Sequence, residues 1–493
     1  MCTSTNPADM PLALIVGAGP SGLCVANLLQ SFGRKFVLIE AQAEFDQFSK
    51  ATGVHSNTLK LLDKLGLIEE ISKKSIVFNG NRIFNEGKLV KEIEFTQGQE
   101  PNDKNISISQ YSLQKILQGR LKSQIQFNSR LVDFEQTDES VTAVVEKASQ
   151  GRFSIKAKYL IACDGAKSIV RHQLNIPFEG ETSPEWSFTF DAKVLTKLDS
   201  DKMYMYTKDN ALLVMVPLPQ GFKFSGRVST EWHAKLSEAD ATERCTLLAR
   251  LVFERSALEL DAKTIQGFSL FHLAARIAST MRDKRIFLVG DAAHVCYPNK
   301  GYGLNTAIED AFSLAWRLVA AENNSVDNIL EAFNRERLEN ARQIQADSTQ
   351  QKKSDDNLKT DAKALEKQKE EQIYSQSQGV LVRLESVLPV DVCKSIQSNR
   401  QTKLSEVFHT NPGFTVIVNT KIKENRSQTQ QTLKEALGLS VKWVYTTTVP
   451  SDEEEYYDIS RANCSLFKEH PESIILIRPD NFLKIVHIRH VDN

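Results

Sequence analysis

A glycine-rich turn near the N-terminus constrains the fold of this chain more than any other feature. Gly17, Gly19 and Gly22 directly follow an apolar run at residues 12–16, and residues 23–31 have the composition of a helix. An apolar run without alternation is typical of a strand buried on both faces. In a strand–turn–helix unit, the first glycine of this spacing permits a tight turn, the second lets the backbone approach a pyrophosphate, and the third lets helix and strand pack closely. The sequence therefore predicts an α/β unit that binds a dinucleotide.

The residues beside these glycines support the same interpretation. Pro20 and Ser21 open the predicted helix, whose N-terminal N–H groups and positive dipole end suit phosphate groups. A second apolar run at residues 36–39 ends at Glu40, 21 residues after Gly19. A carboxylate at this spacing can accept hydrogen bonds from ribose hydroxyls.

A second motif lies in the second half of the chain. Asp291 closely follows the segment Arg-Ile-Phe-Leu-Val at residues 285–289, which has the pattern of a buried strand, so we expect Asp291 at the C-terminal end of that strand, where open α/β sheets bind ligands. Gly301 and Gly303 then precede a predicted helix at residues 305–321. Such a loop brings backbone N–H groups and a helix N-terminus close to a planar ligand. For a flavin, that field would stabilise negative charge developing at N1 and the C2 carbonyl on reduction.

A third motif, residues 159–171, contains the pair Asp164-Gly165 after an apolar segment. An Asp-Gly pair by itself is most often just a turn. Asp164 and Arg171 gain functional weight only because the two other motifs flank them in the chain.

Together the three motifs resemble those of the group A FAD-dependent monooxygenases, the aromatic hydroxylases similar to p-hydroxybenzoate, phenol and polyketide hydroxylases. The glycine fingerprint, the segment Cys-Asp-Gly-Ala-x-Ser-x-x-Arg and the Gly-Asp pair with Pro298 seven residues after Asp291 occur in the family's order. The resemblance implies an α/β fold: a Rossmann-like FAD-binding domain of the GR2 type, an antiparallel-sheet substrate domain and a C-terminal thioredoxin-like domain. It also implies FAD as cofactor, and NAD(P)H and O2 as co-substrates.

The resemblance further implies a set of cofactor-binding residues. Glu40 would bind the adenosine ribose, Asp291 the ribityl chain, and the loop from Gly301 onward would line the isoalloxazine ring. Asp164 would be mainly structural, and a part in the response to NAD(P)H is left open. The whole set comprises Gly17, Gly19, Pro20, Ser21, Gly22, Glu40, Lys50, Gln110, Asp164, Asp291 and Pro298, with Gly301, Gly303, Leu304 and Asn305 around the ring.

Three positions depart from the family's pattern. Tyr297 replaces the first proline of a Pro-Pro-x-Gly-Gly loop, and Lys300 replaces its first glycine. Lys50 stands where arginine is common. Lys300 would either stabilise reduced anionic flavin or point to solvent, and Tyr297 would either shape the substrate pocket or merely cap it. Both pairs of alternatives stay open.

The expected domain organisation is discontinuous. We expect an FAD-binding domain at residues 1–180 and 272–345 with a β insertion at about 75–108, a substrate-binding sheet at 181–271, a helical linker at 346–400 and a thioredoxin-like domain at 401–493. The last of these has no Cys-x-x-Cys pair, so packing or dimer contacts are expected of it rather than a redox role. A homodimer is left open.

The expected reaction is hydroxylation of a phenolic or polycyclic aromatic substrate through a flavin C4a-hydroperoxide. Because the chain has one dinucleotide fingerprint, NAD(P)H is expected to bind transiently, as in the family. No catalytic base is identified, and His294 is expected to order the Gly-Asp loop rather than to transfer protons. Candidates for the base, for each of which an ordinary sheet or surface role is favoured, are His233, His272, Tyr204 and Tyr206. Candidate pocket walls, for which core packing is an equal alternative, are Phe188, Phe190, Leu213, Met215 and Phe224.

Other activities on the same scaffold are weighed against this one. A flavin halogenase is disfavoured because the segment Trp-x-Trp-x-Ile-Pro is missing and the four tryptophans lie far apart in the chain. A Baeyer–Villiger or epoxidising oxygenase, a reductase and a non-catalytic FAD-binding regulator stay open.

Composition argues against other kinds of partner. The chain has 61 basic and 62 acidic residues and no basic block, so no nucleic-acid partner is expected. Seven scattered cysteines without Cys-x-x-Cys spacing predict neither a metal site nor a disulfide framework. No apolar run of about 18 residues and no signal pattern occur, so we expect a cytoplasmic protein without a membrane span.

Overall fold

The computed structural model describes most of the first 357 residues and five short strands beyond them. The described residues are 10–48, 52–95, 101, 104–209, 211–298, 301–323, 327–357, 414–419, 441–446, 456–457, 473–477 and 483–487. Lys50 and Lys300, for which the sequence suggests flavin contacts, lie outside them.

A five-stranded sheet forms the centre of the N-terminal part, with strand order β17-β18-β11-β1-β2. The four strands from β18 to β2 are parallel, and β17 is antiparallel at the edge. Apolar strands of this kind are stable when both faces of the sheet are covered, which explains their continuous apolar runs. The strands are β1 (Ala13–Val16), β2 (Phe36–Ile39), β11 (Tyr159–Ala162), β17 (Arg282–Asp283) and β18 (Ile286–Leu288).

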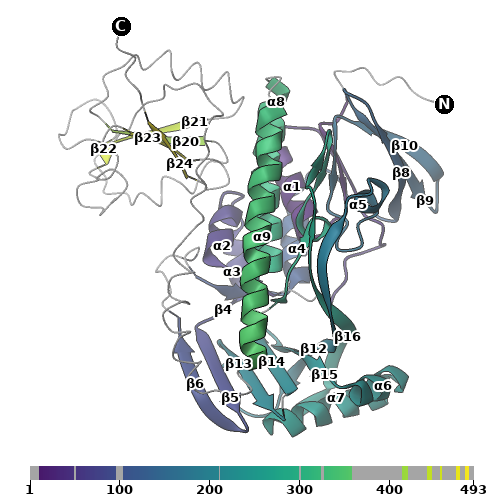
Figure 1. Ribbon diagram of the computed structural model, residues 1–493, viewed down its shortest axis with the longest axis vertical. Coiled ribbons are helices and arrows are strands. Elements are labelled where there is room, and N and C mark those ends of the chain that lie inside the picture. Colours follow the sequence, from purple (N-terminus) through teal and green to yellow (C-terminus); the bar gives the residue numbers. More distant parts are fainter. Residues whose placement is uncertain are drawn as a thin grey trace.

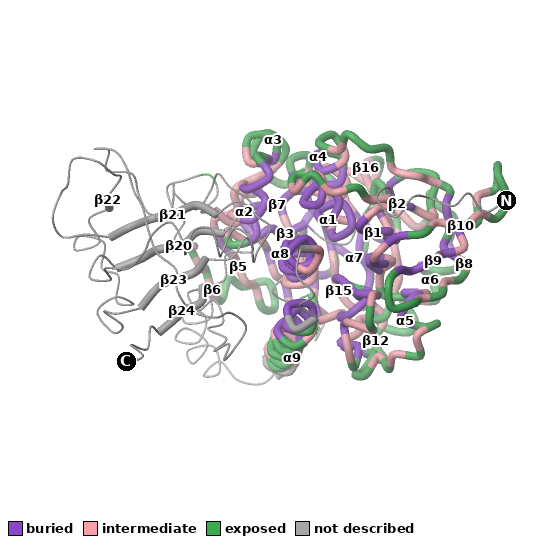
Figure 2. Tube along the Cα trace, turned by 90° about the horizontal axis from the view of Figure 1, so that it is seen from above, coloured by how far each residue is buried: buried purple, intermediate pink, exposed green. Residues whose placement is uncertain are grey.

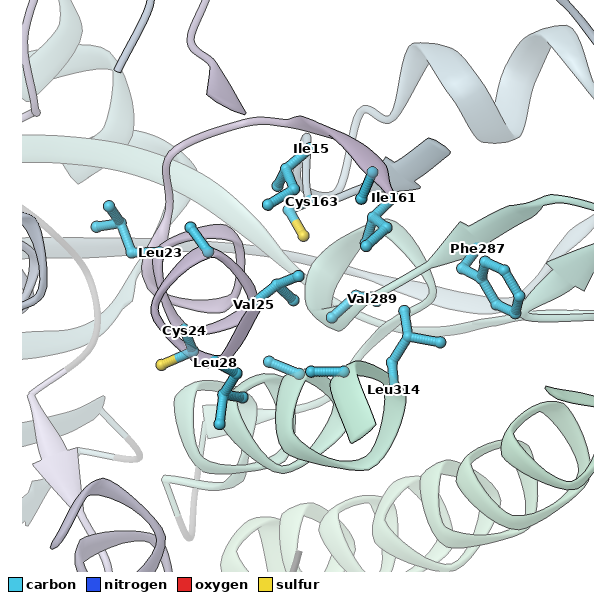
Figure 3. Packing of buried hydrophobic residues seen from close by; sticks show 14 of the residues in the cluster. Ile15, Leu23, Cys24, Val25, Leu28, Ile161, Cys163, Phe287, Val289 and Leu314 are labelled. Atoms are coloured by element: carbon cyan, nitrogen blue, oxygen red, sulfur yellow. The ribbon is translucent and has the colours of Figure 1, made fainter. Parts of the chain in front are cut away.

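Helices α1 and α8 pack against each other and against this sheet, and together they bury its apolar side chains (Figure 3). Val25 of α1 and Leu314 of α8 lie on the sides of their helices that face strand residues such as Ile161, and Leu28 lies between the two helices (Figure 3). Figure 2 shows the buried positions running along both helices, whereas α9 keeps a largely exposed face. The helices of this part are α1 (Pro20–Ser31), α2 (Ser56–Asp63), α3 (Ile68–Lys73), α4 (Gln110–Gly119), α5 (Ile169–Gln173), α8 (Tyr302–Asn323) and α9 (Asp327–Asn357).

Two small antiparallel sheets complete the N-terminal part. One is a three-stranded meander, and the other joins β3, β7 and β4. Between α4 and β8, Gln126 forms a single parallel bridge with Ile39. The strands are β8 (Ser129–Gln136), β9 (Val141–Lys147), β10 (Gly151–Ala157), β3 (Gly53–Val54), β7 (Ile106–Ser107) and β4 (Ile76–Val77).

An eight-stranded sheet with order β19-β16-β12-β15-β14-β13-β5-β6 forms the second large unit (Figure 1). Its two longest strands, β12 and β16, are antiparallel, and the expected boundaries at residues 180 and 271 fall inside them. The unit is therefore joined to the first by continuous strands rather than by loops. The strands are β5 (Gly80–Asn85), β6 (Lys88–Glu94), β12 (Phe178–Val194), β13 (Lys202–Lys208), β14 (Ala211–Leu218), β15 (Gly221–Val228), β16 (Leu260–Ala278) and β19 (His294–Val295).

The insertion expected at about residues 75–108 contributes a hairpin to this second sheet. Strand β5 of the hairpin pairs in parallel with β13. Lys202 of β13 forms ion pairs with Glu92 (2.7 Å) and Glu94 of β6, and Arg82 of β5 donates to Glu92 at 2.8 Å. These charges fasten the hairpin to a strand more than 100 residues away in the chain.

One face of the eight-stranded sheet is covered by helix α7 (Ala241–Ser256), with α6 (Thr230–Glu238) beside it. The five candidate pocket walls are all 0% exposed and belong to one apolar cluster with Leu248, Leu251 and Val252 of α7. These side chains are therefore part of the core. They alternate along the strands because every second residue lies on the face of the sheet that α7 covers. The five residues are Phe188, Phe190, Leu213, Met215 and Phe224.

The C-terminal part is described as a five-stranded sheet with order β22-β21-β20-β23-β24. Helix α9 continues through residue 346, where a linker was expected to begin, and the rest of that expected linker lies outside the described residues. None of the described helices is long and apolar enough to cross a membrane. The strands are β20 (Phe414–Asn419), β21 (Val441–Thr446), β22 (Tyr456–Tyr457), β23 (Ser473–Ile477) and β24 (Leu483–His487).

Candidate flavin-binding site

The first glycine turn connects β1 to α1 in a form that excludes side chains at two of its three glycines. Gly17 has φ +99°, and a Cβ atom there would overlap the carbonyl oxygen of Cys163. A Cβ atom on Gly22 would overlap the carbonyl oxygen of Gly17. At Gly19, by contrast, the position of a Cβ atom has no neighbour within 4 Å among the described residues. The turn is thus closed on the protein side and open in front of Gly19, as a pyrophosphate group requires.

Helix α1 presents its N-terminus to the same open side. Gly19 is the N-cap and supplies no side-chain hydrogen bond, and Pro20 occupies the first helical position. Ser21 is buried against the second motif, 3.3 Å from where a Cβ atom of Gly290 would lie. An N-terminus without a side-chain cap leaves its N–H groups available for an anion.

Glu40 lies at the end of β2 and is tied to the glycine turn. Its carboxylate accepts hydrogen bonds from the N–H of Ala18 (2.8 Å) and the N–H of Gln42 (2.9 Å). Carboxylate oxygens accept more than one hydrogen bond each, so ribose hydroxyls can still be bound. Glu40, which its spacing from Gly19 predicted at the end of a strand, is therefore held beside the glycine turn by these hydrogen bonds.

Helix α4 supports the turn from the other side. Gln114 is buried and donates from Nε2 to the carbonyl oxygen of Ala18 at 3.1 Å. Gln110 lies four residues earlier on α4, so both side chains occupy one face of the helix. Gln110, a predicted flavin contact, therefore lies on the same face of α4 as Gln114, which no sequence motif predicted.

Asp164 follows β11 and caps helix α5. Its Oδ2 accepts from the N–H of Ile169 at 2.9 Å, whereas its buried Oδ1 has no hydrogen-bond partner among the described residues. Burial raises the pKa of this carboxyl above its ordinary value. Asp164 is therefore a structural cap with one enclosed oxygen.

Arg171 connects the second and third motifs. Its guanidinium donates to the carbonyl oxygens of Ala292 (2.8 Å) and Ala166 (2.9 Å) and lies 3.8 Å over the ring of Phe178, the first residue of β12. Arg171 is 6% exposed. The buried side chain holds together the Asp-Gly segment, the Gly-Asp segment and the strand that leads into the second sheet.

The Gly-Asp motif forms a short 3-10 helix, η3 (Gly290–Ala292), directly after β18. Gly290 has φ +63°, where L side chains are strained. The side chain of Asp291 is exposed, while Gly290 and Ala292 on either side are buried. The turn therefore directs the Asp291 carboxylate outward from the end of the parallel sheet, as the sequence predicted.

A buried carboxylate, Asp310 of α8, lies beneath this turn, and the sequence analysis did not identify it. It accepts hydrogen bonds from the N–H of Gly290 (3.0 Å), from His294 (2.7 Å) and from Arg337 of α9 (2.6 Å). Burial acts to raise the pKa of Asp310, but the charges of Arg337 and His294 outweigh it, and the pKa is lowered. His294 thus orders the loop, as expected, through a partner that is 16 residues away.

The glycine loop ends in a clamp made by Asn305. Its Oδ1 accepts from the N–H of His55 (2.9 Å), and its Nδ2 donates to the carbonyl oxygens of Gly53 (3.1 Å) and Gly301 (2.7 Å). Asn305 is 2% exposed. Its amide therefore joins β3, the loop and the start of α8.

The neighbouring loop positions are less enclosed. Among the described residues, no neighbour lies within 4 Å of the position of a Cβ atom at Gly303, and Gly301 has φ +68° with His55 3.6 Å from such a position. Leu304 is buried, whereas Pro298 is exposed and accepts a hydrogen bond from the Gly301 N–H. The loop thus offers open backbone at two glycines, which suits a planar ring.

Tyr297 departs from the family's pattern and is fully buried. Its hydroxyl donates to Glu181 of β12 at 2.9 Å, which ties the Gly-Asp loop to the second sheet. In the same loop, Tyr302 donates to Asp347 of α9 at 2.6 Å, and burial together with Asp347 raises its pKa. Each tyrosine therefore fastens the loop to another element.

The four candidate bases form two groups, one in the core of the second sheet and one around Trp186. Tyr204 and Tyr206 are buried in the core of the second sheet, where burial raises the pKa of both, to about 12 for Tyr206. The rings of His233 and His272 each lie with their centroid 3.9 Å from that of Trp186, His233 stacked on it and His272 tilted. Packing explains each of them, in line with the ordinary role favoured from the sequence.

The described residues fit FAD and offer no metal centre. Among them, no group of three or more His, Cys, Asp or Glu side chains could hold a metal ion. The open glycine turn, the uncapped N-terminus of α1, Glu40 and the exposed Asp291 lie along one edge of the parallel sheet, where open α/β sheets bind ligands.

The chain belongs to the FAD binding domain family, whose model matches residues 11–348. Among curated relatives, it is 29% identical over 364 residues to a 3-(3-hydroxy-phenyl)propionate/3-hydroxycinnamic acid hydroxylase of Klebsiella pneumoniae, covering 69% of this chain and 63% of the relative. A hydroxylase of the same description from Comamonas testosteroni is 28% identical, with 69% and 57% covered. The chain thus spans less than two thirds of the length of these relatives.

Solved structures show the same fold over nearly the whole chain. The anhydrotetracycline hydroxylase of Streptomyces rimosus matches with a TM-score of 0.72 at 21% identity, covering 96% of this chain and 95% of the other. Aklavinone-11 hydroxylase, in a ternary complex with FAD and aklavinone, matches with a TM-score of 0.74 at 19% identity, covering 98% and 96%. The mixed α/β fold is therefore that of FAD-dependent monooxygenase structures, as the sequence resemblance implied.

Proposed function

We propose that this protein is an FAD-dependent monooxygenase that uses NAD(P)H and O2 to hydroxylate a phenolic or polycyclic aromatic substrate. The observation that carries the proposal is the convergence of the three sequence motifs on one edge of a parallel sheet in a chain of the FAD binding domain family. The similarity to hydroxylases of 3-(3-hydroxy-phenyl)propionate supports a substrate with a phenolic ring.

Each motif has a task in this proposal. The turn at Gly17, Gly19 and Gly22, with Pro20 and Ser21 at the start of α1, binds the pyrophosphate, because N–H groups and the positive end of the helix dipole favour phosphate there. Glu40 binds the adenosine ribose and Asp291 the ribityl chain. Bound FAD would supply the redox chemistry with NAD(P)H and O2. The protein would hold the substrate and exclude water from the site.

The loop at the start of α8 has the electrostatic task. Gly301, Gly303, Leu304 and Asn305 lie beside the isoalloxazine ring, where the N-terminal end of a 22-residue helix stabilises negative charge. The remaining predicted contacts are Lys50, Gln110, Asp164 and Pro298.

The finer organisation of the chain is part of the proposal. A GR2-type FAD-binding domain at residues 1–180 and 272–345 would carry the substrate domain at 181–271 as an insertion, with a linker at 346–400. The five C-terminal strands, in mixed parallel and antiparallel pairing, are consistent with a thioredoxin-like domain at 401–493 that makes packing or homodimer contacts.

Oxidation of NADPH and NADH by the purified protein with FAD tests the proposal. The reactions contain 3-(3-hydroxyphenyl)propionate, other phenols or polyketide aromatics, and products are analysed by mass. We expect one class of compound to stimulate NAD(P)H oxidation and to gain 16 mass units at a ring carbon. Oxygen inserted beside a ketone or across a double bond would point to a Baeyer–Villiger or epoxidising enzyme, and bound FAD without NAD(P)H turnover to a regulator.

A further inference from the structure

The buried carboxylate Asp310 lies where it can control the cofactor site without touching the cofactor. It is 0% exposed and projects from α8 under the turn that ends β18. Its Oδ2 accepts from the N–H of Gly290 and from His294 Nε2, and its Oδ1 accepts from Arg337 Nε. Because an ionised carboxylate only accepts hydrogen bonds, Nε2 of His294 is the donor in this contact.

The charge of Asp310 is balanced inside the protein. Arg337 of α9 is 1% exposed, and its Nη2 also donates to Glu309 at 3.2 Å. Removal of one partner of a buried ion pair leaves the other charge buried without compensation, which strongly destabilises the fold. The pair therefore holds α8 and α9 together directly beneath the Gly-Asp turn.

The backbone of the turn is closely packed. A Cβ atom on Gly290 would lie 2.9 Å from Cβ of Ala307, one turn before Asp310 on α8. The N–H of Ala293 donates to the carbonyl oxygen of Gly290 at 2.8 Å, and His294 pairs with Ile277 of β16. The hydrogen bond from the Gly290 N–H to Asp310 therefore sets the orientation of the Val289–Gly290 peptide, which leads into the turn that carries Asp291.

We propose that Asp310, held by Arg337 and His294, is a positioning residue that fixes the Gly290-Asp291 turn in the shape required to bind FAD. The inference rests on the binding of FAD at this site in the proposed function. It adds Asp310, Arg337 and His294, three buried residues that are not among the predicted cofactor contacts. Asp310 acts through the backbone of Gly290, so its effect belongs to cofactor affinity and to the flavin environment.

The chain contains a matched control on the same two helices. Arg317 of α8 donates to Glu336 of α9 at 2.6 Å, and both side chains are buried. Arg317 also donates to the carbonyl oxygen of Ser313 at 2.7 Å, within α8. Asp310→Asn and Glu336→Gln therefore remove the same kind of buried charge from the same helix interface, and Asp310 is the one that accepts the hydrogen bond from Gly290 of the turn.

The experiment measures the dissociation constant of FAD and the visible circular dichroism of bound flavin for the wild type and both variants, with urea unfolding of the apoproteins as the stability reference. We expect Asp310→Asn to weaken FAD binding about 10- to 100-fold, the usual range for a residue that orients a ligand-binding group, and to change the flavin spectrum. Glu336→Gln should lower stability to a similar degree and leave affinity and spectrum near those of the wild type.

His294→Gln provides a second route if Asp310→Asn does not fold, because Arg337 then still balances Asp310. We expect a smaller loss of FAD affinity, again with a spectral change. Equal FAD affinities for the Asp310→Asn and Glu336→Gln variants would overturn the proposal. So would a wild-type flavin spectrum in both the Asp310→Asn and the His294→Gln variant. Since FAD binding is measured without turnover, absence of hydroxylation by the wild type would count against the proposed function alone.

Discussion

Replacing the side chain of Glu40 is the most direct test of the proposed adenosine end of the site. Replacement by alanine removes the acceptor of the Ala18 and Gln42 N–H groups as well as the expected ribose contact. Hydrogen bonds to charged groups contribute about 1.5–3 kcal/mol each, so FAD affinity should fall roughly 10- to 100-fold. Fluorescence titration with FAD measures this change. Glu44→Ala, at an exposed acid four residues on, is the control, and an equal effect in both variants would contradict the assignment.

Asp164 gives a pH-dependent prediction at the same scale. Burial raises its pKa in the folded state, so the stability that depends on its neutral form is complete below the ordinary Asp pKa, about 3.9, and declines as pH rises through the folded-state pKa. Asp164→Asn cannot ionise and can still cap α5. We therefore expect the variant to gain stability relative to the wild type as pH rises from about 4 to 8. Urea unfolding of both apoproteins across this range is the measurement, and a difference that does not change with pH would refute the prediction.

At the scale of elements, the clamp of Asn305 joins a strand, a loop and a helix. Asn305→Ala leaves the N–H of His55 and the carbonyl oxygens of Gly53 and Gly301 without this partner. With about 1 kcal/mol for each hydrogen bond, the free energy of unfolding should fall by roughly 2–3 kcal/mol, and FAD should bind more weakly because the loop is no longer fixed to β3. Denaturant unfolding and FAD titration report the two effects. Asn57→Ala, at an exposed position of α2, should change neither.

At the scale of the whole molecule, FAD binding should raise the stability of the fold. The site draws on β1, β2, α1, α4, α8 and η3, which pack in one core, so a ligand bound only by the folded state stabilises all of them together. FAD at a hundred times its dissociation constant should add about 2.7 kcal/mol to the free energy of unfolding. A thermal melt with increasing FAD tests this. A melting temperature that does not rise with FAD, under conditions where the wild type is folded, would contradict FAD binding at this site.

The sequence by itself determined the parts of the molecule that depend on local spacing. The apolar run before Gly17 predicted β1, and the distance from Gly19 to Glu40 predicted the acid at the end of β2, because a strand, a tight turn and a helix of limited length leave few ways to connect. Asp291 was placed at the end of a buried strand by the same reasoning, and the exposed carboxylate there agrees with it. The family and its α/β fold followed from these motifs.

The tertiary structure alone decided which distant residues meet. The alternation of Phe188 and Phe190 shows that one face of a strand is buried, but only the packing of α7 shows that this face is core. The pairing of β5 with β13, and the contact of Asp310 with Arg337 and His294, join segments whose local sequence carries no sign of the partner. A local pattern fixes the conformation of its own segment, whereas the partner of a buried charge or a strand edge is fixed only when the whole chain has packed.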